Sequence, residues 1–272
     1  MSNQAISTQQ HDHYTEAGEH IISRDVKLSD IGRWLKNGWH DMAHAPGISM
    51  FYGLVMSLSV VLVFFAFQHQ PIHMFTVATV FILLSPFMAT GLYYTAQKLE
   101  QGNKPSLGES MVAWKENVSD IAFFAAALGV ITAMWATFTP LLAAIVVGSS
   151  SLLIINPNMG IMGFLTSEVG LTFLAIFASI GLILSAFVFA ISVVTIPLLL
   201  RDKKMGAVSA MILSFKIVME NKMVMAAWAL VIGFMLTVGI MSLGLGMLIV
   251  MPLLGYASWH AFNDLVEIDG KV

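Results

Sequence analysis

The residues of this sequence best suited to metal chemistry are histidines near its two ends. The stretch "NGWHDMAHAPG", residues 37–47, places His40 and His44 four residues apart. Residues at this spacing share one face of a helix, so the two imidazoles could ligate a metal together with His260 from the C-terminal stretch "SWHAFND". A pair of histidines is only weakly specific for a metal. The alternative, which we favour, is that residues 37–47 form a structural elbow at a membrane surface.

A second set of residues suits copper. Methionine thioethers and imidazoles bind Cu(I), and the chain contains 19 methionines. The candidates lie in the stretches "HQPIHM" and "NMGIM" and are His69, His73, Met74, Met159 and Met162. Methionine is also a common apolar filler in helices. We therefore expect these residues to serve packing, and we expect neither a metal nor another cofactor.

Composition identifies the elements that must position these residues. Hydrophobic residues make up 57% of the chain and charged residues 11%, and the mean hydropathy is +0.81, which is far from the balance of a soluble domain. The sequence therefore predicts an integral membrane protein. It contains no cysteine, which excludes disulfides, thiolate metal sites and a thiol nucleophile. A net charge of -3 gives no indication of a nucleic-acid partner.

Hydropathy divides the chain into a polar tail and a membrane domain. Residues 1–27 are polar and lack the order of a cleavable signal, so we predict a disordered cytoplasmic tail followed by a membrane domain over residues 28–268. Crossing the hydrocarbon takes about 20 helical residues. Six apolar runs are long enough, and we predict six transmembrane helices at residues 47–67, 74–96, 121–147, 169–200, 223–241 and 244–262.

The distribution of positive charge predicts the orientation. The chain contains 13 lysines and arginines. All of them lie before the first apolar run, between the second and third runs, between the fourth and fifth runs, or after the sixth run. Because positive residues remain on the cytoplasmic side, both termini should be cytoplasmic. Residues 140–168 are less clear, since they could continue the third span or lie in the outer interface.

The membrane domain has a threefold internal repeat. Each unit contains a short amphipathic segment, a span, an outer turn and a second span with a proline, and the units begin near residues 28, 106 and 205. The layout predicts an all-α, polytopic membrane helix bundle of three helical hairpins with interfacial amphipathic elbows. We expect the prolines to bend helices and shape packing. The equivalent prolines are Pro86, Pro197 and Pro252, and the elbow aromatic residues are Trp39, Trp114 and Phe215.

Two Trp-His pairs could meet if the third unit packs beside the first. Trp39 and His40 lie near the start of the chain, and Trp259 and His260 lie near its end. Their ring nitrogens could then form hydrogen bonds, with Asp264 as an acceptor. The alternative is that each tryptophan belongs only to the aromatic belt of the membrane interface.

Three stretches of the sequence resemble a known family. "WLKNGWHDMAHAPGISMFYGLV" and "LLGYASWHAFNDL" flank "SPFMATGLYYTAQKLEQGNKPSLGESMVAW", and together they resemble the bacterial predicted integral membrane proteins of domain of unknown function 2189 over residues from about 21 to 267. The resemblance implies a location in the bacterial inner membrane. Some members are labelled as subunits of cytochrome c oxidase, which implies an association with respiratory complexes. No histidine here lies mid-span, so we do not expect the catalytic role of such a subunit.

The predicted spans contain no Asp, Glu, Lys or Arg between residues 47 and 96 or between residues 223 and 262, and Glu168 lies at the edge of the fourth. Ion-coupled transporters and intramembrane enzymes need such groups. The hydroxyl side chains should bond to their own helices. We therefore expect no enzymatic activity. The hydroxyl residues considered are Ser57, Thr132, Ser185 and Thr195.

Small residues recur at a spacing of four on the fourth span, as in Gly181 with Ser185 and Ala186 with Ala190, and they permit close helix contacts. We expect a non-catalytic accessory or assembly subunit of a membrane complex. The partners would be the lipid bilayer and either other membrane subunits or further copies of the chain. The alternative is a channel or facilitator for a small neutral or apolar solute.

Overall fold

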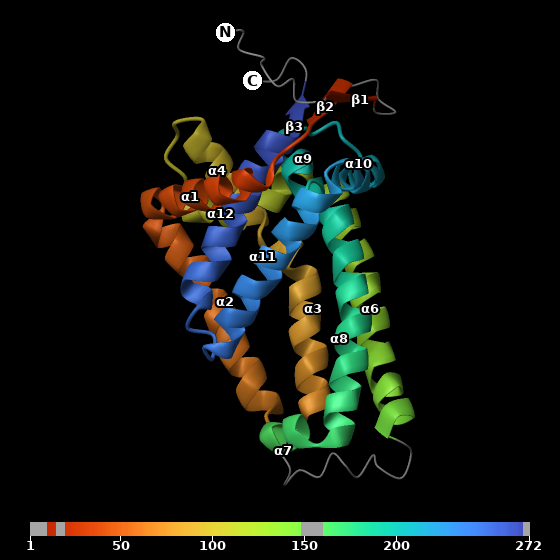
Figure 1. Cartoon of the computed structure of the whole chain (residues 1–272). Helices are drawn as coiled ribbons and strands as arrows, with labels where there is room; N and C mark the ends of the chain where they lie inside the picture. Colours follow the sequence, from red (N-terminus) through yellow and green to blue (C-terminus); the bar gives the residue numbers. More distant parts are fainter. Residues whose placement is uncertain (1–9, 15–19, 148–159, 269–272) are drawn as a thin grey trace, which may run out of the picture.

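The computed structural model describes residues 10–14, 20–147 and 160–268 and shows a helix bundle capped at one end by a small sheet (Figure 1). The strands are β1 (Gln10–Tyr14), β2 (His20–Arg24) and β3 (Val266–Ile268). The helices are α1 (Leu28–His44), α2 (Pro46–Phe67), α3 (Pro71–Met88), α4 (Thr90–Glu100), α5 (Leu107–Met111), the 3-10 helix η1 (Ala113–Asn117), α6 (Val118–Val147), α7 (Gly160–Thr166), α8 (Glu168–Ser192), α9 (Thr195–Arg201), α10 (Ala207–Glu220), α11 (Lys222–Met241) and α12 (Met247–Leu265).

Long apolar helices dominate the described chain, and the prediction of a multi-pass membrane protein is confirmed. Five helical stretches are long and apolar enough to cross a bilayer, namely Pro46–Phe67, Pro71–Glu100, Ala113–Val146, Glu168–Arg201 and Lys222–Met241. The sixth predicted span corresponds to α12, which is not among them. Its second half carries His260, Asn263 and Asp264, and these residues lower its hydropathy. Six spans are therefore not confirmed.

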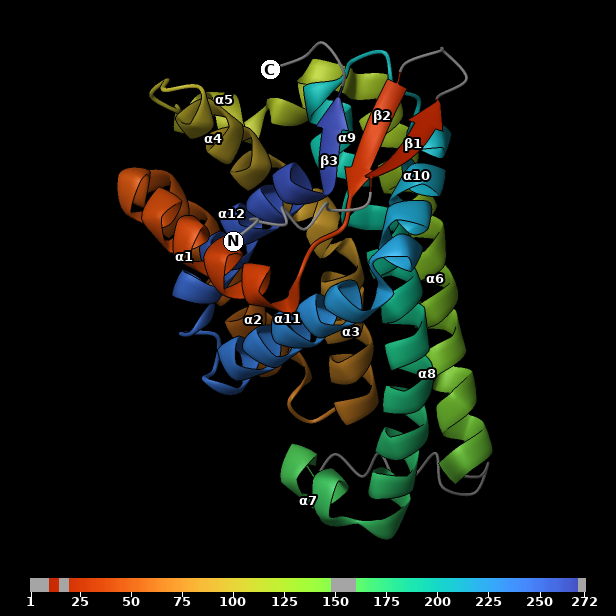
Figure 2. The ribbon, with the colours of Figure 1, turned by 45° about the horizontal axis from the view of Figure 1, so that its top comes forward.

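The three sequence units pack in a cyclic order. The elbow of each unit contacts the second helix of the preceding unit: α5 contacts α4, α10 contacts α8 and α9, and α1 contacts α12. The last of these contacts brings the third unit beside the first. Figures 1 and 2 show α1, α4 and α10 gathered at the end of the molecule that carries the sheet, with α7 at the opposite end.

Close backbone approaches explain why small residues occur on these contacts. A Cβ atom on Gly38 of α1 would lie 2.8 Å from a backbone nitrogen of α12. One on Gly91 of α4 would lie 2.7 Å from the carbonyl oxygen of Ser110 in α5. In the third unit, Ser214 of α10 donates a 2.7 Å hydrogen bond from its hydroxyl to a carbonyl of α8. Larger side chains at these positions would push each elbow off its neighbour.

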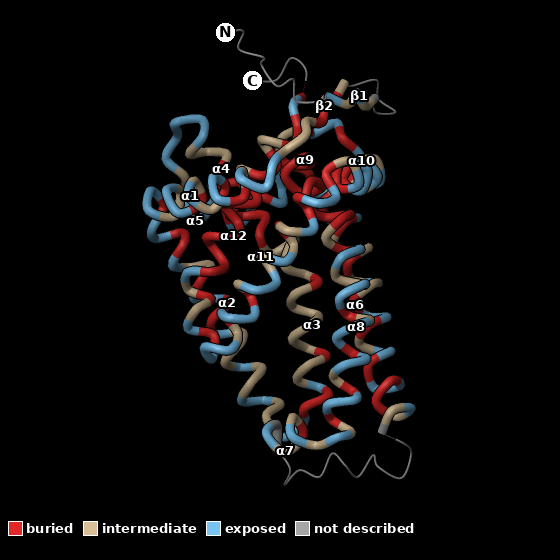
Figure 3. Tube along the Cα trace, in the orientation of Figure 1, coloured by how far each residue is buried: buried red, intermediate tan, exposed pale blue. Residues whose placement is uncertain are grey.

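The core is concentrated around α12, at the end that carries the elbows (Figure 3). Every residue from Val250 to Trp259 is buried. Helix α12 contacts α1, α2, α4 and α11, so it is enclosed by protein on most sides. Below this region, α2, α6 and α8 keep much of their apolar surface exposed, as expected for helices that face lipid, while the side chains of α3 are mostly half-buried.

The sheet was not predicted from the sequence. Residues 10–14 and 20–24 were expected to belong to a disordered tail, whereas the described chain is otherwise a helix bundle. Strand β2 pairs antiparallel with β1 and also with β3 from the far end of the chain, where Ser23 lies opposite Val266. Ile21 and Val266 are buried in the core. The pairing of β2 with β3 joins segments more than 240 residues apart and leaves no local signal, whereas β1 pairs only with β2, its neighbour in the chain.

The three prolines have the expected relation to helix geometry. Pro86 leaves the carbonyl of Ile82 without its helical partner, and the Ser85 hydroxyl donates a 2.7 Å hydrogen bond to that carbonyl. Helix α3 ends two residues later at Met88, and α4 begins at Thr90. Pro197 lies two residues into α9, just after the break that ends α8. Pro252 lies inside α12, which continues past it.

Candidate functional site

The three predicted metal candidates lie near one another but do not converge. His260 of α12 is 2.7 Å from Asp41 of α1 through its Nε2 atom. His44 uses its Nδ1 atom to bond the carbonyl oxygen of His40 at 2.8 Å. The rings of His40 and His44 pack together, with centroids 4.1 Å apart. Within the described ranges, no group of three or more His, Asp or Glu residues could hold a metal ion.

The copper candidates are only partly described. Met159 lies outside the described residues. His73 stacks on the ring of Phe67, with centroids 6.3 Å apart, and the Met162 side chain is largely exposed. These contacts do not bring the two stretches together into a set of ligands.

A polar rim joins the first and third units at the elbow end. Trp34 of α1 is fully buried, and its indole nitrogen donates a 2.6 Å hydrogen bond to the Asp264 carboxylate of α12. Arg33 donates to the same carboxylate, also at 2.6 Å. The hydrogen bond to Asp264 raises the pKa of Arg33. The predicted acceptor Asp264 is therefore used, but by Trp34 and Arg33 rather than by Trp39 or His40.

The second half of the rim joins α12 to α4 and α9. The Trp259 indole donates to Glu100 at 3.0 Å, and Arg201 donates to Asn263 at 2.6 Å. The Arg201 guanidinium also lies 5.1 Å from the centre of the Trp259 ring, a cation-π distance. Trp39, by contrast, is 54% exposed. The ring nitrogens of the two Trp-His pairs therefore do not bond to one another as predicted, and His260 bonds instead to Asp41, the neighbour of His40.

Trp34, Glu100 and Arg201 are the rim residues that sequence reasoning missed. Each lies at the cytoplasmic end predicted for its segment, where charged and aromatic residues are ordinary. Glu100 and Asp264 both stand nine residues after a glycine, Gly91 and Gly255, and this matched spacing is the signal that could have identified them.

The sheet is attached to the third elbow by a compact network. Ser23 of β2 is fully buried and donates a 2.6 Å hydrogen bond to Glu220 at the end of α10. His13 of β1 is 3.1 Å from the Ser23 hydroxyl and 3.2 Å from the Glu220 carboxylate, using the same Nε2 atom for both. Because Ser23 is fully buried and its hydroxyl donates a hydrogen bond to a carboxylate, this contact holds β2 against α10 and has a structural role.

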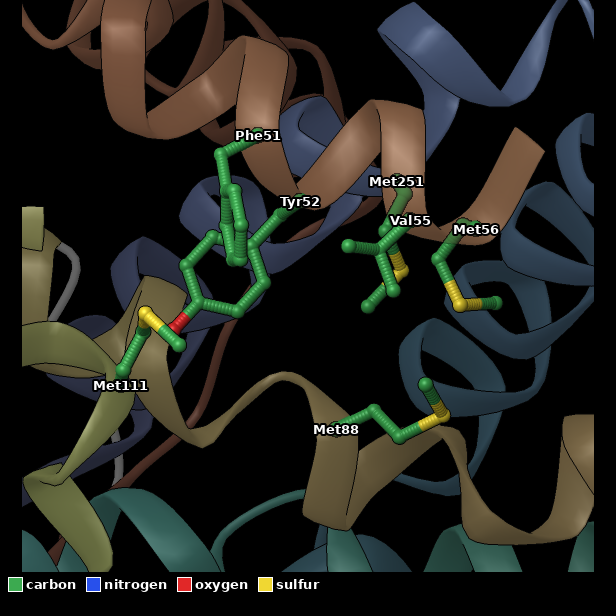
Figure 4. A pocket seen from close by; sticks show the side chains of 7 residues that line it. All are labelled: Phe51, Tyr52, Val55, Met56, Met88, Met111 and Met251. Atoms are coloured by element: carbon green, nitrogen blue, oxygen red, sulfur yellow. The ribbon is translucent and has the colours of Figure 1, made fainter. Parts of the chain in front are cut away.

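One pocket opens beside the rim. It encloses about 240 Å³ and lies where α2, α3, α5 and α12 meet (Figure 4). Its lining is apolar except for the Tyr52 hydroxyl, which lies 3.3 Å from the hydroxyl of Ser110. Val55 and Met111 are partly exposed, so the opening is apolar as well. The lining residues are Phe51, Tyr52, Val55, Met56, Met88, Met111 and Met251.

None of the four serine and threonine residues considered from the sequence lines this pocket. Thr132 and Thr195 are buried and donate to carbonyls three and four residues before them, at 2.9 and 2.6 Å. Ser57 is buried and Ser185 is half-buried. The predicted small-residue row of α8 faces inward at Gly181, where a Cβ atom would contact the Trp135 ring of α6 at 3.5 Å.

Comparison with known proteins gives a family and no further relatives. Residues 74–201 match the model of a family described as predicted integral membrane proteins, domain of unknown function 2189. The resemblance predicted from the sequence is therefore confirmed, over a shorter stretch than the predicted one. No curated protein and no solved structure matches the chain.

Proposed function

We propose that this integral membrane protein is a non-catalytic accessory or assembly subunit of a membrane complex. The family that its residues 74–201 match, domain of unknown function 2189, has no assigned function. Each helix long enough to cross the bilayer is thinly covered by its own chain, with 17–28% of its most apolar 18 residues buried. This observation carries the proposal, because a large intramembrane surface is left for partner helices or lipid.

The chemistry of the interior supports a role without catalysis. The spans contain no Asp, Glu, Lys or Arg between residues 47 and 96, and the Thr132 and Thr195 hydroxyls are engaged by their own helices. A nucleophile paired with a base, or a set of metal ligands, would be needed for intramembrane catalysis. We propose that the protein is not an enzyme and needs no cofactor.

The proposed orientation places the elbows, the rim and the sheet in the cytoplasm, in the inner membrane of a bacterium. All 13 lysines and arginines lie in the segments on this side of the membrane, and positively charged loops remain in the cytoplasm. Reporter fusions after Lys104, Lys204 and Lys271 should all report a cytoplasmic position. A periplasmic signal at Lys104 or Lys204 would contradict the orientation.

Purification of the native complex tests the accessory role. The chain extracted in mild detergent should carry a membrane partner at a constant stoichiometry. Helix α11 offers an accessible row, where Leu230 and Phe234 are 67% and 70% exposed beside Gly233, which has open space around it. Serine at Leu230 and Phe234 should weaken the association, while serine at Leu62, exposed to a similar degree on α2, is the matched control. A chain that purifies without any partner at a constant stoichiometry, even in mild detergent, would contradict the proposal.

The pocket favours the second candidate, a facilitator or carrier of a small apolar solute. Four methionines and an apolar opening suit an apolar molecule with at most one hydrogen-bonding group, for which Tyr52 is the partner. A photoreactive apolar probe should then label the peptides that carry Met88 and Met111, and Met56→Trp should abolish the labelling by filling the pocket. Equal labelling of the wild type and Met56→Trp would remove this candidate.

A further inference from the structure

The turn between α11 and α12 lies at the middle of α2, not at its far end. Gly244, in this turn, approaches α2 so closely that a Cβ atom on it would lie 2.8 Å from the carbonyl oxygen of Ser57. Ser57 lies 11 residues beyond Pro46, a rise of about 16 Å along the helix. Phe67, where α2 ends, lies a further 15 Å or so along the same axis.

Helix α12 gives a second, independent measure of the depth. Gly38 of α1, the elbow helix, would place a Cβ atom 2.9 Å from the carbonyl oxygen of Leu253. Leu253 lies nine residues after Gly244, which is a rise of about 14 Å. Both measures place the turn roughly 15 Å from the elbow layer, which is half of a hydrocarbon core about 30 Å thick.

Helix α11 reaches this shallow depth because it runs obliquely. Trp228, six residues into α11, still packs edge to face against Trp34 of α1, with ring centroids 5.5 Å apart. Figures 1 and 2 show α11 crossing under α1 at a slant, with its turn ending short of the level reached by the lower ends of α2 and α3. Twenty residues would span a bilayer only if the helix stood nearly upright.

The chemistry of the turn suits hydrocarbon. Its large exposed side chains are Met241, Leu243 and Leu245, which are 78%, 59% and 67% exposed, and the exposed Ser242 hydroxyl donates a 2.8 Å hydrogen bond to the carbonyl of Gly239. Ser242 accepts a 2.7 Å hydrogen bond at its hydroxyl from the Gly246 backbone nitrogen, and Met247 donates to the carbonyl of Gly244 at 3.0 Å. A turn within lipid must satisfy its backbone groups internally, and this turn does so at these positions.

We propose that α11 and α12 form a re-entrant hairpin that enters the bilayer from the elbow side, turns near the midplane and returns. Its tip, defined by Met241, Leu243 and Leu245, is an interaction surface whose partner is lipid hydrocarbon. Four helical stretches then cross the membrane instead of six, and both termini still lie on one side. The inference uses the proposed position of the elbows at the interface, but it does not depend on which face of the membrane is cytoplasmic.

The absence of cysteine from the sequence makes accessibility labelling a direct test. Single cysteines are introduced as Leu243→Cys at the tip, Gln70→Cys in the turn between α2 and α3, and Lys104→Cys between α4 and α5. A membrane-impermeant maleimide is then applied to intact cells and to inverted vesicles. Gln70→Cys and Lys104→Cys should react from opposite sides. Leu243→Cys should react from neither, at less than a tenth of the control level, and should react with a lipid-soluble maleimide.

Labelling of Leu243→Cys from the same side as Gln70→Cys would overturn the re-entrant hairpin and support a full crossing. An inverted orientation would exchange the sides of the two controls and leave the tip unlabelled, so the two proposals fail separately. A second measurement covers poor folding of the cysteine variant. Leu243→Lys should reduce the amount of inserted protein at least fivefold, while Gln70→Lys should not, and equal amounts would contradict a tip in hydrocarbon.

Discussion

Helices α3 and α12 both contain a proline of the sequence repeat but have very different surroundings in the molecule. Pro86 lies two residues before the end of α3, whereas Pro252 is the sixth residue of α12, so α3 precedes the repeat proline and most of α12 follows it. Of the 18 residues of α3, only Pro71, Ile72, Thr76 and Leu83 are buried. In the 19 residues of α12, every position from Val250 to Trp259 is buried (Figure 3). The part of the second span that follows the proline is therefore the buried part, and α4, which follows Pro86, is buried from Thr90 to Ala96 as well.

The difference arises from the neighbours of each helix. Helix α12 is enclosed by α1, α2, α4 and α11, whereas α3 contacts mainly α6 and α2, and most of its side chains are only half-buried. Close packing around α12 depends on glycines, since Gly38, Gly53 and Gly255 each lie where a Cβ atom would be under 3 Å from a neighbour. We therefore expect changes around α12 to affect stability far more than changes around α3.

The largest expected effect comes from filling a contact of α12. In Gly53→Val the new side chain would meet the backbone of Leu248, since a Cβ atom would lie 2.5 Å from its carbonyl oxygen. Backbone cannot move aside as a side chain can, so we expect a loss of about 3 kcal/mol. Thermal unfolding in detergent measures it. Gly233→Val, where no atom lies within 4 Å, is the control, and an equal loss there would contradict the comparison.

The next effect concerns the buried bond between α1 and α12. Trp34→Phe removes the indole donor from Asp264 and keeps the aromatic ring beside Trp228. Hydrogen bonds to charged groups contribute about 1.5–3 kcal/mol, so we expect a loss of about 2 kcal/mol in the free energy of unfolding. Trp39→Phe, on an exposed ring, should change it little. Similar values for the two variants would show that Asp264 is satisfied without Trp34.

A smaller effect on the free energy of unfolding is expected at His260, one of the three candidate metal ligands. His260→Gln should lose the bond to Asp41 and lower stability by about 0.5–1.5 kcal/mol. His44→Gln should be nearly neutral, because His44 bonds only a carbonyl of its own helix among its described polar contacts. Metal analysis and absorption spectra accompany both variants. Haem absorption or bound metal that disappears in His260→Gln would restore the ligand hypothesis.

The smallest effect is expected on α3. Ser85→Ala removes the hydroxyl that donates to the carbonyl freed by Pro86. Intramembrane hydrogen bonds of this kind average about 0.6 kcal/mol, so we expect a loss of roughly that size. The melting curve measured beside that of Trp34→Phe tests it. A loss as large as that of Trp34→Phe would mean that α3 is as tightly determined as α12.

The organisation of the candidate site could be predicted only in part. The meeting of the chain ends through α1 and α12, and the choice of Asp264 as an acceptor, follow from the repeat and from residue types. The identity of the donor does not. Trp34 and Trp39 are equally good candidates by sequence, and only the helix rotation, set by the close contact at Gly38, buries Trp34 and exposes Trp39.

The sequence by itself determined the class of protein, the positions of the apolar helices, the threefold layout and the side on which positive charge gathers. Hydropathy, proline and charge act locally, so each can be recognised within about 20 residues. The tertiary structure alone decided the sheet from both chain ends, the partners of Trp34 and Trp259, and the shallow depth of the turn at Gly244. These features depend on contacts between residues far apart in the sequence, in the sheet by more than 240 positions, and no local property of the chain encodes them.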